Sequence, residues 1–282
     1  MDQKRVLENW KKQLGELFPE REIRNLFHLT LEDALGFNRA LILSNQVGEF
    51  SGDQMRQLEQ VLNRLKAGEP LQYIVGFTYF DDLKIQVAPG VLIPRPETEE
   101  LVAWIDESLQ NRENLKMEDW CTGSGCIALA LQNRYINSEV FGYDISDEAL
   151  EIARNNGKSL HLAVHFENKD ALNAVSSEKA DVIVSNPPYI PWQEKAEMHR
   201  NVTEFEPDLA LFVPNDDPLL FYRSLTIYAS KSLAPGGLLF FELHENYARE
   251  TKQMVEESGF TSVEIREDLQ GKQRMLKAVW NA

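Results

Sequence analysis

Apolar residues recur at helical spacing through the first 68 residues of the chain. They form three stripes, which comprise Val6, Leu7, Trp10, Leu14, Leu17 and Phe18, then Leu31, Ala34 and Leu35, and then Met55, Leu58, Val61, Leu62 and Leu65. Apolar positions three and four residues apart cover one face of a helix. Residues 51–54 add an N-capping signal before the last stripe. Residues 1–68 are therefore predicted to form a small domain of short helices, with these stripes as its core.

After Gly68 the pattern changes to alternating apolar and polar residues. Three segments rich in aromatic and β-branched side chains are strand candidates, namely residues 73–76, 79–80 and 83–87. We predict a β-hairpin linker over residues 69–95. Its last part is extended because prolines fix the backbone, and Arg95 lies between two of them. A rigid extended backbone can direct a single charge, so Arg95 is a candidate substrate-binding residue.

The rest of the chain, residues 96–282, alternates short apolar runs with helical patterns. The strand candidates are residues 140–144, 164–166, 182–184, 238–243, 263–265 and 275–279. The helix candidates start near residues 96, 127 and 149 and cover residues 218–233 and 247–258, with a turn expected at residues 235–237. Strands that alternate with helices predict an α/β domain with a mostly parallel sheet.

Composition and charge limit the kinds of molecule that the chain is expected to bind. The chain has 282 residues and a formal net charge of −16, with a sequence pI near 4.8. Nucleic-acid binding relies on Lys and Arg, so we expect no direct nucleic-acid contact and favour a basic protein partner. No apolar run approaches membrane-spanning length, and the first residues lack the apolar core of a signal peptide. We expect a cytoplasmic monomer with no membrane contact.

The cysteines and histidines match no metal or redox framework. Cys121 and Cys126 flank a glycine loop at a spacing that fits neither zinc nor disulfide patterns, so reduced packing residues are expected. His161 and His165 lie four residues apart in strand-like sequence with no acidic or thiol cluster nearby. His244 follows an apolar strand with no recognisable partner, and a structural role is expected for it. We expect no bound metal.

An acceptor-rich turn follows the strand candidate at residues 182–184. Pro187 and Pro188 fix φ and lack a donor, so the turn is stiff and its carbonyls are free. The Asn186 side-chain oxygen and the Pro187 carbonyl can accept both N–H bonds of an amide or exocyclic amine and hold its nitrogen toward an electrophilic methyl group. Tyr189 can stack on the flat group. The alternative is a strand-ending turn without chemistry.

A strand-loop-helix signal lies upstream of this Asn-Pro-Pro-Tyr turn. Its glycine loop consists of Cys121, Thr122, Gly123, Ser124 and Gly125. The next strand ends at Asp144, about twenty residues on, where a carboxylate can bond both ribose hydroxyls. The same pattern satisfies the dinucleotide fingerprint, so a dehydrogenase is a rival. The turn favours S-adenosylmethionine as the cofactor, because a nicotinamide enzyme has no evident use for Asn-Pro-Pro-Tyr.

The third strand candidate, residues 164–166, is followed by Asp170 and Ala171. Asp170 is placed to bond the adenine amino group, and Ala171 is placed against the ring. A helix N-cap with no ligand is the alternative interpretation of Asp170.

Four segments, in this order and spacing, resemble the HemK/PrmC release-factor glutamine methyltransferases. They are residues 68–76 (Gly-Glu-Pro-Leu-Gln-Tyr-Ile-Val-Gly), residues 92–99 (Leu-Ile-Pro-Arg-Pro-Glu-Thr-Glu), the glycine loop and the Asn-Pro-Pro-Tyr turn. The resemblance spans nearly the whole chain and implies a class I SAM-dependent methyltransferase domain with a Rossmann-like seven-stranded sheet at residues 96–282. It also implies a small N-terminal all-helical domain that recognises the substrate.

The implied activity is methyl transfer from S-adenosylmethionine, with S-adenosylhomocysteine as product. The acceptor is N5 of the glutamine in the Gly-Gly-Gln motif of class 1 peptide chain release factors. Residues 92–99 favour this branch over relatives that act on a ribosomal-protein glutamine. An adenine-N6 or other nucleic-acid or protein amide methyltransferase with the same turn is the alternative function, and a non-catalytic binding module is another.

The resemblance also implies residue roles. The residues implied to bind the cofactor are Cys121, Thr122, Gly123, Ser124, Gly125, Asp144, Asp170, Ala171 and Asn186. Those implied to hold the glutamine amide are Asn186, Pro187, Pro188 and Tyr189. Two positions depart from the family pattern. Ala171 stands where some members have an aromatic residue against adenine, and Cys121 is the first small residue of the loop. Glu206 and Pro207 also match the family and are treated as structural.

Overall fold

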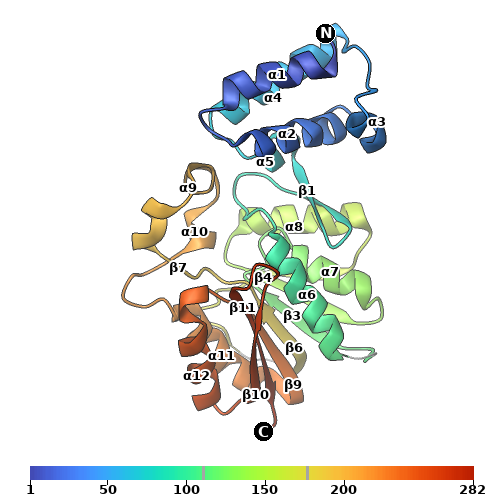
Figure 1. The fold of residues 1–282 in the computed structure, drawn as a ribbon. Coiled ribbons are helices and arrows are strands. Elements are labelled where there is room, and N and C mark those ends of the chain that lie inside the picture. Colours follow the sequence, from blue (N-terminus) through green and yellow to red (C-terminus); the bar gives the residue numbers. More distant parts are fainter. Residues whose placement is uncertain (110–111, 176–177) are drawn as a thin grey trace. The chain divides into compact units, whose positions relative to one another are not determined.

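The computed structural model describes residues 1–109, 112–175 and 178–282. It consists of two compact units (Figure 1). The first unit comprises Met1–Phe77 and His199–Phe205, and the second comprises Thr78–Met198 and Glu206–Ala282. No helix within the described ranges has the length and apolar character needed to cross a membrane.

The first unit is helical, as the apolar stripes predict. Its elements are α1 (Gln3–Leu14), α2 (Glu20–Leu29), the π-helical turn η1 (Thr30–Ala34), α3 (Arg39–Leu43), α4 (Gly52–Lys66), α5 (Leu71–Val75) and α9 (Arg200–Phe205). A capping box at Ser51 starts α4. Trp10 and Phe27 meet edge to face in the core, with ring centroids 5.2 Å apart. Most of the predicted stripe residues are buried or half-buried there, but Leu17 and Ala34 are exposed.

The prediction of a strand at residues 73–76 is wrong, because α5 occupies this segment. Pro70 precedes the helix with φ of −59°, and Gly76 ends it in the left-handed region with φ of +85°. The Gly76 N–H donates to the Gln72 carbonyl over 2.8 Å. A proline before the first turn and a left-handed glycine after the last favour a short helix. These end signals outweigh the strand preference of the residues between them.

The predicted β-hairpin is present as β1 (Phe77–Phe80) and β2 (Leu83–Gln86). Asp81 and Asp82 connect the strands with φ of 50° and 62°, as two-residue turns that match strand twist require. Buried Asn156, in α8 (Asp147–Leu160), fixes β2. Its Oδ1 accepts from the Gln86 N–H over 2.7 Å, and its Nδ2 donates to the Gln86 carbonyl over 3.0 Å.

The second unit is built on a seven-stranded sheet, which confirms the predicted α/β class. In spatial order the strands are β10 (Thr261–Glu267), β11 (Gln273–Trp280), β9 (Leu233–Glu242), β6 (Ala180–Ser185), β3 (Lys116–Trp120), β4 (Glu139–Asp144) and β5 (Val164–Asn168). The strands from β9 to β5 are parallel, whereas β11 is antiparallel to both of its neighbours. The carboxyl ends of the parallel strands therefore meet at one edge of the sheet.

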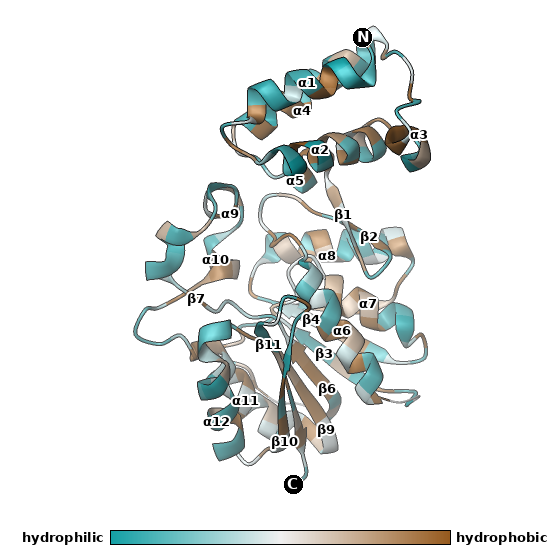
Figure 2. Cartoon of the chain, viewed as in Figure 1, coloured by the Kyte–Doolittle hydropathy of each residue, from teal (hydrophilic) through white to brown (hydrophobic). Residues whose placement is uncertain are grey.

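Helices cover both faces of this sheet. The helices α6 (Pro96–Leu109), α7 (Cys126–Arg134) and α8 lie on one face, and α11 (Leu220–Ser232) and α12 (Ala248–Glu257) lie on the other. Shorter elements are η2 (Trp192–Glu197), α10 (Asp208–Leu211), η3 (Glu245–Tyr247) and a small unpredicted parallel sheet of β7 (Ile190–Pro191) and β8 (Phe212–Val213). Figure 2 shows hydrophobic residues along the central strands, as expected for a sheet buried on both faces.

The predicted turn at residues 235–237 lies inside β9 as an irregularity. Ala180 pairs with Leu233, and Val182 pairs with Leu238. Between these two pairs β6 has one residue and β9 has four, which leaves three extra residues in β9. Gly236 has a φ of +79°, a value that glycine adopts without strain. The turn signal is real, but it produces a bulge because pairing resumes on both sides.

Candidate active site

The carboxyl ends of β3, β4, β5 and β6 lead into a cleft of about 330 Å³. It is lined by Gly90, Val91, Leu92, Cys121, Gly123, Asp144, Ile145, Ser146, Glu148, Ala149, Lys169, Asp170, Ala171, Leu172, Asn186, Pro188, Pro207, Leu209, Ala210 and Phe221. Open α/β sheets bind ligands in a crevice at this end of their strands. Seven of the predicted site residues line the cleft, namely Cys121, Gly123, Asp144, Asp170, Ala171, Asn186 and Pro188. The other six, Thr122, Ser124, Gly125, Pro187, Tyr189 and Arg95, do not belong to its lining.

The glycine loop needs left-handed backbone at three positions. Cys121, Gly123 and Gly125 have φ of 60°, 55° and 82°. A Cβ added at Gly125 would lie 2.9 Å from Cζ of Phe166, whereas one at Gly123 would meet nothing within 4 Å. Gly125 therefore permits close packing of the loop on β5, and Gly123 leaves the cleft side of the loop open.

The buried side of the loop is held by hydrogen bonds. Thr122 Oγ1 donates to Asp119 Oδ2 over 2.5 Å, and the Ala128 N–H donates to the same oxygen over 3.2 Å. Asn156 Nδ2 donates to the Ser124 carbonyl over 3.0 Å. Burial raises the pKa of Asp119 to about 7, and the two hydrogen bonds oppose this rise. Thr122 and Ser124 thus shape the loop from behind.

Asp144 ends β4 and faces the cleft. Its Oδ2 accepts from the Gly123 N–H over 2.9 Å, and its Oδ1 accepts from the Ser146 N–H over 3.0 Å. Burial raises the pKa of Asp144, and the hydrogen bonds from backbone N–H groups oppose this rise. Each carboxylate oxygen accepts up to two bonds, so the carboxylate keeps acceptor capacity for a pair of hydroxyl groups while it orders the glycine loop.

Asp170 and Ala171 form another part of the cleft wall. Asp170 Oδ1 accepts from the Leu172 N–H over 2.8 Å, and Oδ2 accepts from Asn173 Nδ2 over 2.6 Å. These bonds are those of a turn closed by an aspartate side chain. Residues 171–173 form a turn and a bend rather than the start of a helix, so the helix N-cap interpretation of Asp170 is wrong, and each oxygen keeps a second lone pair. Ala171 is 6% exposed, and together with Ile145 it gives the cleft an apolar wall.

The Asn-Pro-Pro-Tyr turn follows β6 and is anchored at both ends by one carboxylate. Asn186 Nδ2 donates to Thr98 Oγ1 over 3.3 Å, and Thr98 Oγ1 donates to Glu242 Oε2 over 2.6 Å. Tyr189 donates its hydroxyl proton to Glu242 Oε1 over 3.0 Å. Burial raises the pKa of Glu242, opposed by the bonds from Thr98 and Tyr189 and by the charge of Arg274.

Sequence reasoning missed Thr98 and Glu242. Thr98 lies in the first turn of α6, where a threonine is commonly explained as helix capping. The sequence does contain a signal for Glu242, because this carboxylate directly follows the apolar residues of β9. Strand β9 neighbours β6 in the sheet, and its end therefore lies beside the turn.

Arg95 pairs with a buried carboxylate. Its Nη2 lies 2.5 Å from Glu206 Oε1, and the Ile93 N–H donates to Glu206 Oε2 over 3.1 Å. The Glu206 side chain is only 1% exposed. The pair anchors the segment that precedes α6, and Val91 and Leu92 of this segment line the cleft. Substrate binding by Arg95 itself stays a prediction.

The expectation that His244 lacks a partner is wrong. Its Nε2 lies 3.0 Å from Glu194 Oε2, and its Nδ1 accepts from the Asn246 N–H over 3.1 Å. Its ring meets Tyr189 edge to face with centroids 5.8 Å apart. The histidine therefore helps to hold the tyrosine of the turn.

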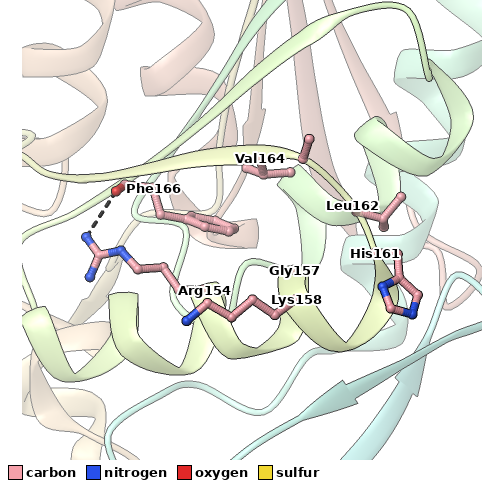
Figure 3. A pocket seen from close by; sticks show the side chains of 8 residues that line it. Arg154, Gly157, Lys158, His161, Leu162, Val164 and Phe166 are labelled. Carbon is pink, nitrogen blue, oxygen red and sulfur yellow. Dashed lines mark hydrogen bonds between the residues drawn. The ribbon is translucent and has the colours of Figure 1, made fainter.

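A second hollow, of about 440 Å³, lies between α8 and β5 (Figure 3). Figure 3 shows the guanidinium of Arg154 directed to the carbonyl of Phe166, which it bonds over 3.0 Å. Lys158 and His161 also line the hollow, whereas His165 stacks on Phe141 with centroids 5.0 Å apart. None of the predicted site residues lines this hollow.

Both cysteines are free thiols. Burial raises the pKa of Cys126 to about 12 and also raises the pKa of Cys121 well above its ordinary value. A protonated thiol is a poor nucleophile, so these residues act by size and packing. Within the described ranges, the structure contains no group of three or more His, Cys, Asp or Glu side chains that could hold a metal ion.

Comparison with known proteins shows similarity to methyltransferases over nearly the whole chain. The Methyltransferase small domain model matches residues 99–205, and the PrmC N-terminal domain model matches residues 5–76. The release factor glutamine methyltransferase of Bacteroides thetaiotaomicron is 40% identical over 270 residues, which cover 95% of this chain and 96% of that protein. That of Flavobacterium psychrophilum is 40% identical over 281 residues, which cover 96% of this chain and 98% of that protein.

Solved structures share the fold. A methyltransferase from Pyrococcus furiosus aligns with a TM-score of 0.52 and 19% identity over 81% of this chain and 99% of that chain. A 16S rRNA N2 methyltransferase from T. thermophilus, solved with AdoMet and guanosine, aligns with a TM-score of 0.54 and 18% identity over 73% of this chain and 50% of that chain. The fold is that of class I methyltransferases, as predicted.

Proposed function

We propose that this chain, which belongs to the release factor glutamine methyltransferase family, transfers a methyl group from S-adenosylmethionine to the side-chain amide nitrogen of a release-factor glutamine. One observation carries the proposal. Thr98 engages the Nδ2 group of Asn186, so Oδ1 of this cleft-lining residue is its free acceptor for an N–H bond. An amide held there shares one cleft with Gly123 and Asp144.

The residues of the cleft fit S-adenosylmethionine. The Asp144 carboxylate has acceptor capacity for a ribose diol, the open position at Gly123 leaves room beside the loop, and Ile145 and Ala171 suit an adenine face. Asp170 would bond the adenine amino group with its remaining lone pairs. When bound, this cofactor supplies a methyl group on a positively charged sulfur.

The turn then orients the acceptor. Asn186 Oδ1 and the Pro187 carbonyl would accept the two N–H bonds of the glutamine amide, and Tyr189 would flank its plane. Pro187 and Tyr189 lie beside the lining residues Asn186 and Pro188 in the chain. No ordinary side chain can deprotonate an amide beforehand, so orientation and exclusion of water account for the catalysis. After in-line transfer of the methyl group, the nitrogen would lose its proton to solvent, and S-adenosylhomocysteine would be the other product.

The substrate is a class 1 peptide chain release factor, methylated at N5 of the glutamine in its Gly-Gly-Gln motif. We assign substrate recognition to the helical domain at residues 1–68, the linker to residues 69–95 and catalysis to residues 96–282. The match of a PrmC N-terminal domain model to residues 5–76 supports the first assignment. The net charge of −16 suits a basic protein partner. Because translation termination takes place in the cytoplasm, we place the reaction there, with the enzyme as a monomer.

Methyl transfer from labelled S-adenosylmethionine to a purified release factor tests the proposal. We expect incorporation into the wild-type factor and none into a Gly-Gly-Ala variant of its motif. Asn186→Ala removes at most one of several expected cofactor contacts, so its Kd for S-adenosylhomocysteine should rise by less than about tenfold. Transfer should fall by about 100-fold or more, the scale of a lost orienting contact in a transition state. Label on the Gly-Gly-Ala variant, or on adenine in nucleic acid instead, would overturn the assignment.

A further inference from the structure

A buried carboxylate connects the two ends of the Asn-Pro-Pro-Tyr turn. Glu242 is 2% exposed and ends β9. It accepts one hydroxyl proton from Thr98 over 2.6 Å and one from Tyr189 over 3.0 Å. Thr98 in turn lies 3.3 Å from Asn186 Nδ2. Glu242 is not part of the cleft lining, so it reaches the substrate only through these residues.

The direction of these bonds is fixed by the chemistry of the groups. An ionised carboxylate only accepts hydrogen bonds, and a hydroxyl has one proton to donate. The Thr98 proton therefore goes to Glu242, and the Thr98 oxygen is left as an acceptor. Only the Nδ2 end of Asn186 can satisfy that acceptor, so Oδ1 turns to the other side.

We propose that Glu242 is a positioning residue that, through Thr98, locks the Asn186 amide with its oxygen toward the substrate. The proposal rests on the proposed function, because it explains why the site accepts a nitrogen that carries two N–H donors. An inverted Asn186 would set its own N–H groups against those of the substrate and leave both unpaired, which costs more than a missing contact. The same carboxylate fixes Tyr189, so one buried charge sets both side chains of the turn.

Glu242→Gln keeps the shape of the side chain but no longer requires Thr98 to donate its hydroxyl proton to residue 242. A glutamine can turn its NH₂ group to Thr98, which frees the Thr98 proton to bond Asn186 Oδ1 and invert the amide. We expect kcat for release-factor methylation to fall by about 10- to 100-fold, the range for one misdirected hydrogen bond, with the Kd for S-adenosylhomocysteine within about twofold of the wild type. Glu267→Gln, at an exposed site on β10, is the control for loss of one charge and should match the wild type.

Thr98 variants separately test the hydrogen-bond relay from Glu242 through Thr98 to Asn186. Thr98→Val keeps the shape without the hydroxyl and should lose about as much kcat as Glu242→Gln, whereas Thr98→Ser should restore most of the activity that valine removes. The double variant Glu242→Gln with Thr98→Val should lose little more than either alone, because both changes break one chain of bonds. Additive losses, or a serine variant as slow as the valine variant, would overturn the relay.

A readout without substrate separates this inference from the proposed function. The side-chain amide signals of Asn186, identified by their loss in isotope-labelled Asn186→Ala, should show slow rotation and slow solvent exchange in the wild type. Both should become faster in Glu242→Gln and in Thr98→Val. Unchanged amide signals together with unchanged kcat would refute the role of Glu242. An inactive wild-type enzyme with the expected change in amide signals would refute the assigned reaction and leave the relay supported.

Discussion

Replacement of Asp144 by asparagine tests the electrostatic part of the cleft. Asp144 accepts the Gly123 N–H on one oxygen and the Ser146 N–H on the other. Asparagine has the same shape, but its NH₂ group must face one of these two N–H donors. The substitution therefore removes a negative charge from the cleft and sets donor against donor at the glycine loop.

The magnitude follows from the bonds at stake. A hydrogen bond to a charged group is worth about 1.5–3 kcal/mol, and the proposed ribose contact uses two of them. Asparagine retains one acceptor oxygen, so we expect a loss of about 3 kcal/mol in cofactor binding, or about 100-fold in Kd. The turn that holds the substrate amide is built on β6 rather than β4, so the KM for the release factor at saturating cofactor should change little.

Isothermal titration with S-adenosylhomocysteine measures this loss directly. Glu151→Gln, an exposed position on the neighbouring helix α8, is the matched control and should bind like the wild type. Thermal unfolding without ligand separates loss of affinity from loss of fold. An Asp144→Asn variant that unfolds at the wild-type temperature and binds with the wild-type Kd would show that this carboxylate does not hold the ribose.

Two further predictions concern the base of the glycine loop. The pKa of Asp119 is 3.8 in the unfolded chain and about 7 in the folded protein. The contribution of Asp119 to the free energy of unfolding is therefore complete below pH 4 and falls by up to about 4 kcal/mol as the pH rises to 7. The difference in unfolding free energy between wild type and Asp119→Asn, measured by denaturant titration at several pH values, should follow this fall, and a pH-independent difference would contradict it. A Cβ at Gly142 would lie 2.6 Å from the Phe166 ring, so Gly142→Ala should cost about 1–3 kcal/mol of stability. Gly142→Ala with Phe166→Leu should recover part of that loss, and failure to do so would place the strain elsewhere.

The parts of the site that follow strands were predictable from sequence. An apolar run gives the strand, and a residue at its end or just after it must lie at the carboxyl edge of a parallel sheet. Asp144 and Asn186 occupy such positions, the glycine loop marks the same edge at Cys121, and all three residues line one cleft. Their meeting required no knowledge of distant contacts, because the βα alternation fixes which edge they share.

The supporting contacts were not predictable in the same way, because they join distant segments. Thr98 and Glu242 lie 144 residues apart, and Arg95 and Glu206 lie 111 apart. No local pattern in the sequence encodes such pairs. The wrong strand at residues 73–76 has a different cause, since local strand preference was weighed without the proline and glycine at the ends of the segment.

Three buried acids on the strands of the sheet, Glu118, Asp119 and Glu242, oppose stability but order the side chains around them. Burial raises the pKa values of Glu242, Asp119 and Glu118, which means that the fold disfavours their charged forms. Apolar replacements for such groups are often neutral or stabilising. Each acid, however, receives a hydroxyl proton, and Glu118 accepts that of Tyr228 over 2.8 Å. An apolar side chain would avoid the desolvation cost but leave these hydroxyl protons without a fixed direction. In the Asn-Pro-Pro-Tyr turn, the direction of the Thr98 hydroxyl proton decides whether Asn186 presents its oxygen or its N–H group to the substrate amide. The desolvation cost of the buried Glu242 charge is therefore the cost of a correctly oriented Asn186.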